Sequence, residues 1–115
     1  MRKRIRVGGT LAEAAKRVAI AWNRASRGER VTTTDTVTFV SWSALASVMT
    51  ERRYELLRHL HHHPARSIRG LARELGRDYK RVHQDVAALS QIGLVEHDGE
   101  ALRADYGEIR TVISM

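Results

Sequence analysis

The fold of this 115-residue chain is decided by residues 67–93, Ser67-Ile-Arg-Gly-Leu-Ala-Arg-Glu-Leu-Gly-Arg-Asp-Tyr-Lys-Arg-Val-His-Gln-Asp-Val-Ala-Ala-Leu-Ser-Gln-Ile-Gly93. Ser67 is a typical helix N-cap, and apolar residues follow it at helical spacing until Gly76, which provides a turn. Asp78 is a second N-cap, and a longer apolar stripe runs from it to Gly93. Two capped helices joined by a short glycine turn predict a helix-turn-helix.

The segments on either side extend this motif. Before it, Thr50 is an N-cap for a helix whose apolar stripe ends near the only proline in the chain. After it, the dipeptide Asp98-Gly99 lies between short apolar runs at 94–97 and 100–104, which is a strong signal for a β-hairpin. Three helices followed by a hairpin predict a winged helix.

Residues 1–49 predict a small N-terminal arm. Thr10 and Glu13 form a capping box, and β-branched residues gather before Ser41, which caps a short helix. The predicted fold class is therefore α+β, with this strand-helix-strand-helix arm packed against a winged helix-turn-helix over 50–115. The expected elements of the arm are a strand at 4–7, a helix from Thr10 to Gly28, a strand at 33–41 and a helix after Ser41.

The charge of the chain is high and unevenly placed. Its 20 Lys and Arg residues outnumber 13 Asp and Glu residues, so a polyanion is the first partner to consider, with solubility as the alternative explanation. Residues 1–50 and residues 52–81 each hold nine basic and three acidic residues, whereas residues 82–115 hold two basic and six acidic ones. Only three of the 20 basic residues are lysines. The excess of arginine either favours bidentate contacts with phosphate and guanine or reflects codon preference. The middle of the chain is the candidate for a nucleic-acid surface.

Several classes of protein are excluded by what the sequence lacks. The absence of cysteine removes disulfides, thiol nucleophiles and thiolate metal sites. The basic start runs into Gly8-Gly9 without an apolar signal region, and no run approaches the roughly 18 apolar residues of a membrane span. There is no Gly-rich phosphate loop, no H-E-x-x-H motif and no activated Ser or His. We therefore expect a cytoplasmic protein that is not an enzyme, with no cofactor and no membrane partner.

Three segments resemble winged-helix transcription factors of the MarR and ArsR kind: Leu71-Ala-Arg-Glu-Leu-Gly76, Arg77-Asp-Tyr-Lys-Arg-Val-His-Gln-Asp-Val86 and Leu89-Ser-Gln-Ile-Gly-Leu-Val95. A narrower similarity is to small prokaryotic winged-helix proteins regarded as transcriptional regulators or type II antitoxins. It is best over residues 45–110, and it rests on Gly76-Arg-Asp-Tyr-Lys-Arg-Val-His83, Ile92-Gly-Leu-Val-Glu96 and Leu102-Arg-Ala-Asp-Tyr-Gly-Glu-Ile-Arg110. The resemblance implies a winged-helix fold, a DNA-binding third helix and, for some members, a gene pair with a small toxin.

The predicted helix after Asp78 has a polar face suited to a DNA groove. Successive residues advance about 100° around a helix, so its apolar residues cluster on one side and leave a polar side opposite. Gln84 suits bidentate pairing with adenine, Arg81 or Lys80 suits guanine, and the small Ala87 permits close approach. The alternative is an ordinary solvated face. The predicted groove-facing side is centred on Lys80, Gln84, Ala87 and Gln91, and the residues that flank these are Arg81 and His83.

Further contacts with the DNA backbone are expected from the second helix and the hairpin. Tyr79 either donates its hydroxyl to a phosphate or packs against the preceding helix, and Arg73 either contacts a phosphate or only pairs with Glu74. The hairpin tip is acidic, so we expect it to stabilise the third helix more than to grip DNA. The predicted backbone contacts are Arg66, Arg69, Arg73, Arg77, Tyr79 and Arg103.

Two other groups of residues have competing interpretations. His59 and His63 have the i, i+4 spacing of a zinc or nickel chelate, but no third ligand is evident, so we favour a protonatable helix end and predict no metal site. Leu11, Val18 and Trp22 share one side of the first predicted helix, and they form part of the core, a dimer seam or a surface that binds a partner.

These observations predict a sequence-specific DNA-binding repressor. One recognition helix reads too few base pairs for useful specificity, so we expect a homodimer on a partial palindrome of double-stranded DNA in its own promoter. The resemblance further implies that the protein is an antitoxin that represses its own operon and binds a small toxin through its arm. The alternatives are a protein-interaction module that neutralises a partner without sequence-specific DNA binding, and a free-standing MarR/ArsR-like repressor. RNA binding is disfavoured because the groove-facing helix lacks aromatic residues for stacking.

Overall fold

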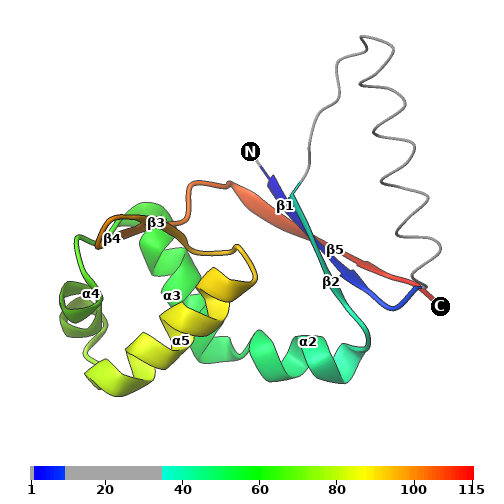
Figure 1. The fold of residues 1–115 in the computed structure, drawn as a ribbon, viewed down its shortest axis with the longest axis horizontal. Coiled ribbons are helices and arrows are strands. Elements are labelled where there is room, and N and C mark those ends of the chain that lie inside the picture. Colours follow the sequence, from blue (N-terminus) through cyan, green and yellow to red (C-terminus); the bar gives the residue numbers. More distant parts are fainter. Residues whose placement is uncertain (1, 10–34) are drawn as a thin grey trace, which may run out of the picture.

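The computed structural model of this protein describes residues 2–9 and 35–115. These residues form a mixed α+β fold with four helices, a three-stranded sheet and a two-stranded hairpin. The sheet lies at one end and the hairpin near the other, as Figure 1 shows. No helix within the described ranges is long and apolar enough to cross a membrane. The elements are β1 (Arg2–Val7), β2 (Asp35–Phe39), α2 (Trp42–Val48), α3 (Glu51–His62), α4 (Ile68–Leu75), α5 (Tyr79–Gln91), β3 (Glu96–Asp98), β4 (Ala101–Arg103) and β5 (Glu108–Ile113).

The helices begin where side chains replace missing backbone partners. Ser41, Thr50, Ser67 and Asp78 each accept a hydrogen bond from the backbone N–H three residues further on, which satisfies one of the free N–H groups of the first turn. Helix α4 ends at Gly76, whose φ of 64° and ψ of 35° lie in the left-handed region that favours glycine. These four predicted N-caps and the glycine turn are therefore confirmed, whereas Thr10 lies outside the described residues.

The three-stranded sheet has β1 at its centre. Its order is β2-β1-β5, and both pairs of strands are parallel. Ile5 lies opposite Val37 on one side and Thr111 on the other. Alternate residues of β1, namely Lys3, Ile5 and Val7, are buried, as period-two strand geometry requires for a sheet with one face on the core.

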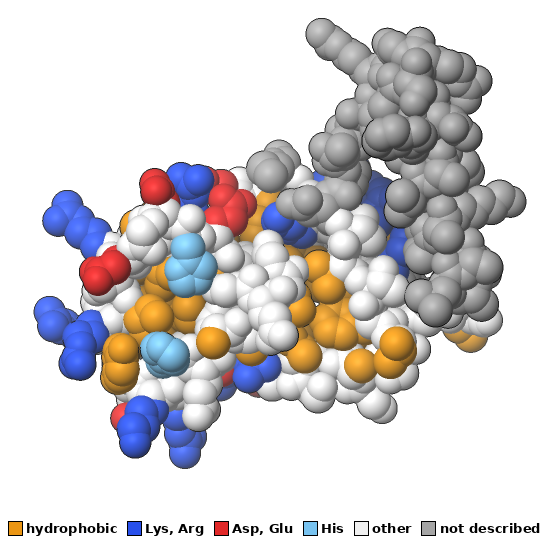
Figure 2. Space-filling view, in the orientation of Figure 1, with side chains coloured by type: hydrophobic (Ala, Val, Ile, Leu, Met, Phe, Trp, Pro, Cys, Tyr) orange, Lys and Arg blue, Asp and Glu red, His pale blue; other side chains and the backbone are white. Residues whose placement is uncertain are grey.

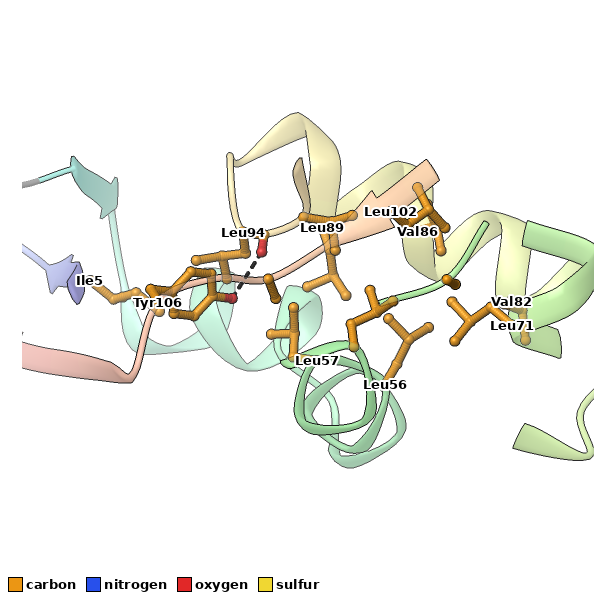
Figure 3. Packing of buried hydrophobic residues seen from close by; sticks show 14 of the residues in the cluster. Ile5, Leu56, Leu57, Leu71, Val82, Val86, Leu89, Leu94, Leu102 and Tyr106 are labelled. Atoms are coloured by element: carbon orange, nitrogen blue, oxygen red, sulfur yellow. Dashed lines mark hydrogen bonds between the residues drawn. The ribbon is translucent and has the colours of Figure 1, made fainter. Parts of the chain in front are cut away.

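One hydrophobic cluster joins the sheet to the helices and the hairpin. Leu56, Leu71 and Leu89 are fully buried within it, and Figure 3 shows Tyr106 between this helical core and Ile5 of the sheet. The Tyr106 hydroxyl donates to the Leu94 carbonyl oxygen at 2.8 Å. Burial and, to a smaller extent, the charge of Glu96 raise the pKa of Tyr106 to about 12. The described part of the arm and the helical part thus pack together, as expected.

One prediction about the strands was wrong, and one strand was not predicted. The hairpin turn is at Gly99 and Glu100 rather than Asp98 and Gly99, because Asp98 pairs with Ala101. Gly99 has a φ of 64°, whereas Glu100 does not have a positive φ. This arrangement is typical of a type II′ turn, in which only the first central residue has a positive φ. Strand β5 was not expected at all, because its partner β1 lies at the opposite end of the sequence.

The described part of the arm agrees with the predicted order of elements. The strand expected at 33–41 is β2 at 35–39, and the strand expected at 4–7 is the longer β1. The helix expected from Thr10 to Gly28 lies outside the described residues. Strand β5 belongs to the segment 50–115 but lies in the sheet of the arm, so the two segments share one sheet.

Candidate nucleic-acid interface

Helix α5 has one buried face and one exposed face. Val82, Val86 and Leu89 are at most 1% exposed and anchor the helix in the core. This burial fixes the rotation of the helix about its own axis, since a rotation would expose these side chains to water. The residues predicted to face a groove lie on the other side, and all are exposed: Lys80, Arg81, His83, Gln84, Ala87 and Gln91.

Basic side chains surround the end of the molecule that α4 and the start of α5 form. Figure 2 shows Lys and Arg side chains projecting there, with acidic ones near the hairpin. Arg66, Arg69 and Arg73 are exposed, and none has an ion pair within the part of the chain that the structure describes. Glu74, the alternative partner of Arg73, instead forms a 2.7 Å hydrogen bond with His59. Arg73 therefore presents an uncompensated charge to solvent.

Tyr79 packs against α4. The Arg69 guanidinium lies 4.7 Å from the centre of its ring, and the His83 ring centre lies 5.9 Å away on the next turn of α5. A guanidinium at this distance over an aromatic face is attracted by the ring electrons, which holds the flexible arginine in place. The Tyr79 side chain remains 39% exposed. Packing against the preceding helix, one of the two interpretations, is thus what the structure shows.

Arg77 has a different environment from the one predicted. Its Nη2 donates to Asp85 Oδ2 at 2.7 Å, and Arg53 Nε donates to Asp85 Oδ1 at 3.0 Å. Arg53 also donates through Nη1 to the Val48 carbonyl oxygen at 2.8 Å. These three charged side chains, which we call the Asp85 clamp, are only 13–19% exposed and join the end of α2, the start of α3 and the turn before α5. Arg77 therefore acts inside the protein, and we leave it out of the candidate interface.

The hairpin is tied to the helices at two points. Ala65, between α3 and α4, exchanges backbone hydrogen bonds of 2.8 and 3.0 Å with Leu102 of β4. On the other strand, His97 shares a 2.6 Å hydrogen bond with Ser90 of α5. Arg103 forms ion pairs of 3.2 Å with both Glu96 and Asp105, so its charge is largely compensated within the hairpin region. The hairpin braces α5, and Arg103 is a weak candidate for a phosphate contact.

A family model described as HVO_A0114 matches residues 48–111, which is more than half of the chain. The chain belongs to the HVO_A0114 family. No similar protein was found among curated proteins, and none among solved structures. The HVO_A0114 match runs from the end of α2 into β5, so it contains α5, its basic surroundings and the Asp85 clamp.

Within this HVO_A0114 region, sequence reasoning missed Asp85 and Arg53. The signal was present, because Asp85 is a charged residue on the otherwise apolar side of α5, between Val82 and Val86. Such a residue needs an internal partner when its helix packs into a core.

Other candidate residues lie in two further places. Leu11, Val18 and Trp22 are outside the described residues. The histidines at the end of α3 make local contacts: His61 Nδ1 is 2.9 Å from the Ala104 carbonyl oxygen, and the rings of His59 and His63 are 5.2 Å apart.

Proposed function

We propose that this protein is a sequence-specific DNA-binding transcriptional regulator in which α3, α4, α5 and the β3–β4 hairpin act as a winged helix-turn-helix. The observation that supports this most directly is helix α5, which is anchored on one side and carries exposed polar and basic residues on the other. A helix of this kind fits the major groove, where side chains distinguish all four base pairs.

The surroundings of α5 supply the second part of the proposal. Arg66, Arg69 and Arg73 present positive charge beside α5, where a winged helix meets phosphate groups. Attraction of this kind does not depend on base sequence and weakens with salt because counterions are released from DNA. The proposed division of labour is therefore that α5 reads bases while the arginines of the α4 region hold the backbone. As in other regulators of this design, two copies would bind a partial palindrome.

The contrast between Gln84 and Arg73 tests this division. Gln84→Ala should reduce preference at one or two base pairs by about 1–3 kcal/mol and leave the salt dependence unchanged. Arg73→Ala should weaken binding to all duplexes alike and reduce the log–log salt slope by about one unit per protomer. Both are measured by fluorescence anisotropy on the native upstream DNA and on a scrambled duplex, across a salt series.

Gln91→Ala is the matched control, because Gln91 is an exposed glutamine on the same side of α5 as Gln84 but two turns further from the start of the helix. Residues near the start of a recognition helix make most base contacts, so this variant should keep the preference of the native protein. Equal losses on both duplexes for Gln84→Ala would contradict the proposed reading face. Absence of wild-type binding to the upstream DNA at low salt would contradict the function itself.

An antitoxin role is a finer proposal that rests on the resemblance alone. In that role the arm binds a small toxin and the winged helix represses the shared operon. Replacing Leu11, Val18 and Trp22 with alanine in the full-length chain would then weaken co-purification of the neighbouring gene product. Full retention of that partner by the substituted chain would contradict this role and leave DNA binding untouched.

A further inference from the structure

The outer edge of β5 carries an ordered row of backbone groups. Strand β5 is the last strand of the order β2-β1-β5, and β1 is its only strand neighbour among the described residues. The Ser114 N–H donates to the Val7 carbonyl oxygen at 2.9 Å, which shows that even-numbered residues of this segment face β1. Because successive residues point their backbone groups to opposite sides, the outward N–H and C=O groups belong to Ile109, Thr111 and Ile113.

This edge has few of the features that prevent strands from pairing. It is six residues long, with no proline and no bulge in its register with β1. Val112 and Ile113 are 38% and 50% exposed, which is high for large apolar side chains in a sheet. Its two charged residues, Glu108 and Arg110, form an ion pair with each other at 3.1 Å. An edge of this kind is a template for another strand.

We propose that a second copy of this chain pairs antiparallel with β5, with the two-fold axis at Thr111. In this register Ile109 lies opposite Ile113 of the second copy, Thr111 lies opposite Thr111, and Ile113 lies opposite Ile109. All three outward residues of each strand then meet outward residues of the other, which forms about six backbone hydrogen bonds. The two sheets become one continuous sheet with both β5 strands at its centre.

The side chains favour this register over the one centred on Arg110. With the axis at Thr111, two isoleucine pairs form on the sheet face that carries the core, and Arg110 lies opposite the apolar Val112. Moving the axis to Arg110 would place two arginines directly opposite each other, which is unfavourable. The proposed register opposes no like charges.

A pocket beside β5 supports the arrival of an apolar side chain. This hollow of about 400 Å³ lies between α3 and the start of β5, and Ile109 is part of its wall. Tyr54, which is 48% exposed, and Leu57 supply apolar surface on the α3 side. The paired strand brings Ile113 of the second copy next to Ile109 and so to this pocket. A homodimer formed by this pairing has the two-fold symmetry of a palindromic DNA site. Only this link to DNA rests on the proposed function.

Charged side chains introduced at Thr111 test the pairing. Thr111→Lys places two like-charged side chains on Cα atoms about 5.5 Å apart across the axis, so the dissociation constant of the homodimer should rise about tenfold or more. Thr111→Glu should do the same. A mixture of the two variants should restore the dimer, because opposite charges then face each other. Analytical ultracentrifugation over a concentration series measures all three samples, and circular dichroism verifies their folding.

A cross-link provides an independent measurement. The chain has no cysteine, so Thr111→Cys introduces a single thiol. Across the axis the two thiols would lie within reach of a short bismaleimide, which should give a covalent dimer. Thr38→Cys is the matched control, because Thr38 is an exposed threonine on β2, the opposite edge strand of the same sheet. It should stay monomeric under the same treatment in denaturing gels.

The outcomes separate this inference from the proposed function. A wild-type protein that is monomeric at about 100 µM, a Thr111→Lys variant that dimerises as tightly as wild type, or cross-linking through Thr38 instead of Thr111 would each overturn the pairing. DNA binding by wild type together with any of these results leaves the proposed function intact. A dimer that behaves as expected at Thr111 but does not bind upstream DNA refutes only the function.

Discussion

Replacing Asp85 with asparagine tests whether the Asp85 clamp holds α5 in place. The amide keeps the shape of the side chain but removes the charge shared by Arg53 and Arg77, whose donor atoms lie 3.0 and 2.7 Å from the carboxylate oxygens. All three side chains are at most 19% exposed, so water replaces little of the lost interaction. Arg77 already has one buried nitrogen, Nη1, without a hydrogen-bond partner among the described residues. Removing one partner of a buried ion pair costs about 3 kcal/mol or more.

We expect the free energy of unfolding of Asp85→Asn to fall by about 3 kcal/mol, which lowers the urea midpoint by about 1–3 M. Urea denaturation followed by circular dichroism measures this change. Glu108→Gln is the matched control, since Glu108 also pairs with two arginines, Arg2 and Arg110, but is 45% exposed. Exposed ion pairs contribute little, so this variant should lose about 0.5 kcal/mol or less. Equal losses in the two variants would refute the reasoning that burial gives the clamp its strength.

Three further predictions concern stability. Tyr106→Phe should destabilise the fold by about 1–2 kcal/mol, because the buried Leu94 carbonyl loses its donor; an unchanged urea midpoint would contradict this. The pKa of Tyr106 rises from 10.0 to about 12 on folding, so wild type should lose stability between pH 10 and 12, and it should lose more than Tyr106→Phe does over that interval. Parallel pH profiles of the two proteins would refute this. Gly76→Ala should lower the free energy of unfolding by about 1 kcal/mol through backbone strain alone, since no atom lies within 4 Å of an added Cβ. Gly76→Asn should lower it less, because asparagine adopts the left-handed region more readily than alanine. The reverse order of the two variants in thermal unfolding would argue against strain.

The features that could be predicted from the sequence are those that depend on neighbouring residues. Ser67 caps α4 and Gly76 ends it through contacts within a few residues, so their types and spacing sufficed. The exposed face of α5 followed from helical periodicity in the same way. The hairpin was placed one residue early because both Asp-Gly and Gly-Glu fit a two-residue turn, and only the pairing of Asp98 with Ala101 decides between them.

The remaining features depend on contacts between distant residues. Strand β5 is rich in β-branched residues, but nothing near it in the sequence indicates that β1 is its partner. Arg77 was counted with the other arginines near α4 because a charge count does not show which guanidinium has a carboxylate within reach. That carboxylate belongs to Asp85, and its second arginine, Arg53, is on another helix. Local patterns therefore predicted the exposed polar side of α5 but overestimated the number of exposed, unpaired arginines beside it.

The central position of β1 sets an order for folding. Helices α4 and α5 contact residues close to them in the sequence, and such local contacts form quickly. Ile5, in contrast, meets Thr111 only after nearly the whole described chain has been made, and closing so long a loop costs more entropy than closing a short one. During synthesis β1 therefore exposes an unpaired side until residues 108–113 leave the ribosome. The pairing of β5 with β1 therefore completes the sheet late, and until then one side of β1 is open to pairing with another chain.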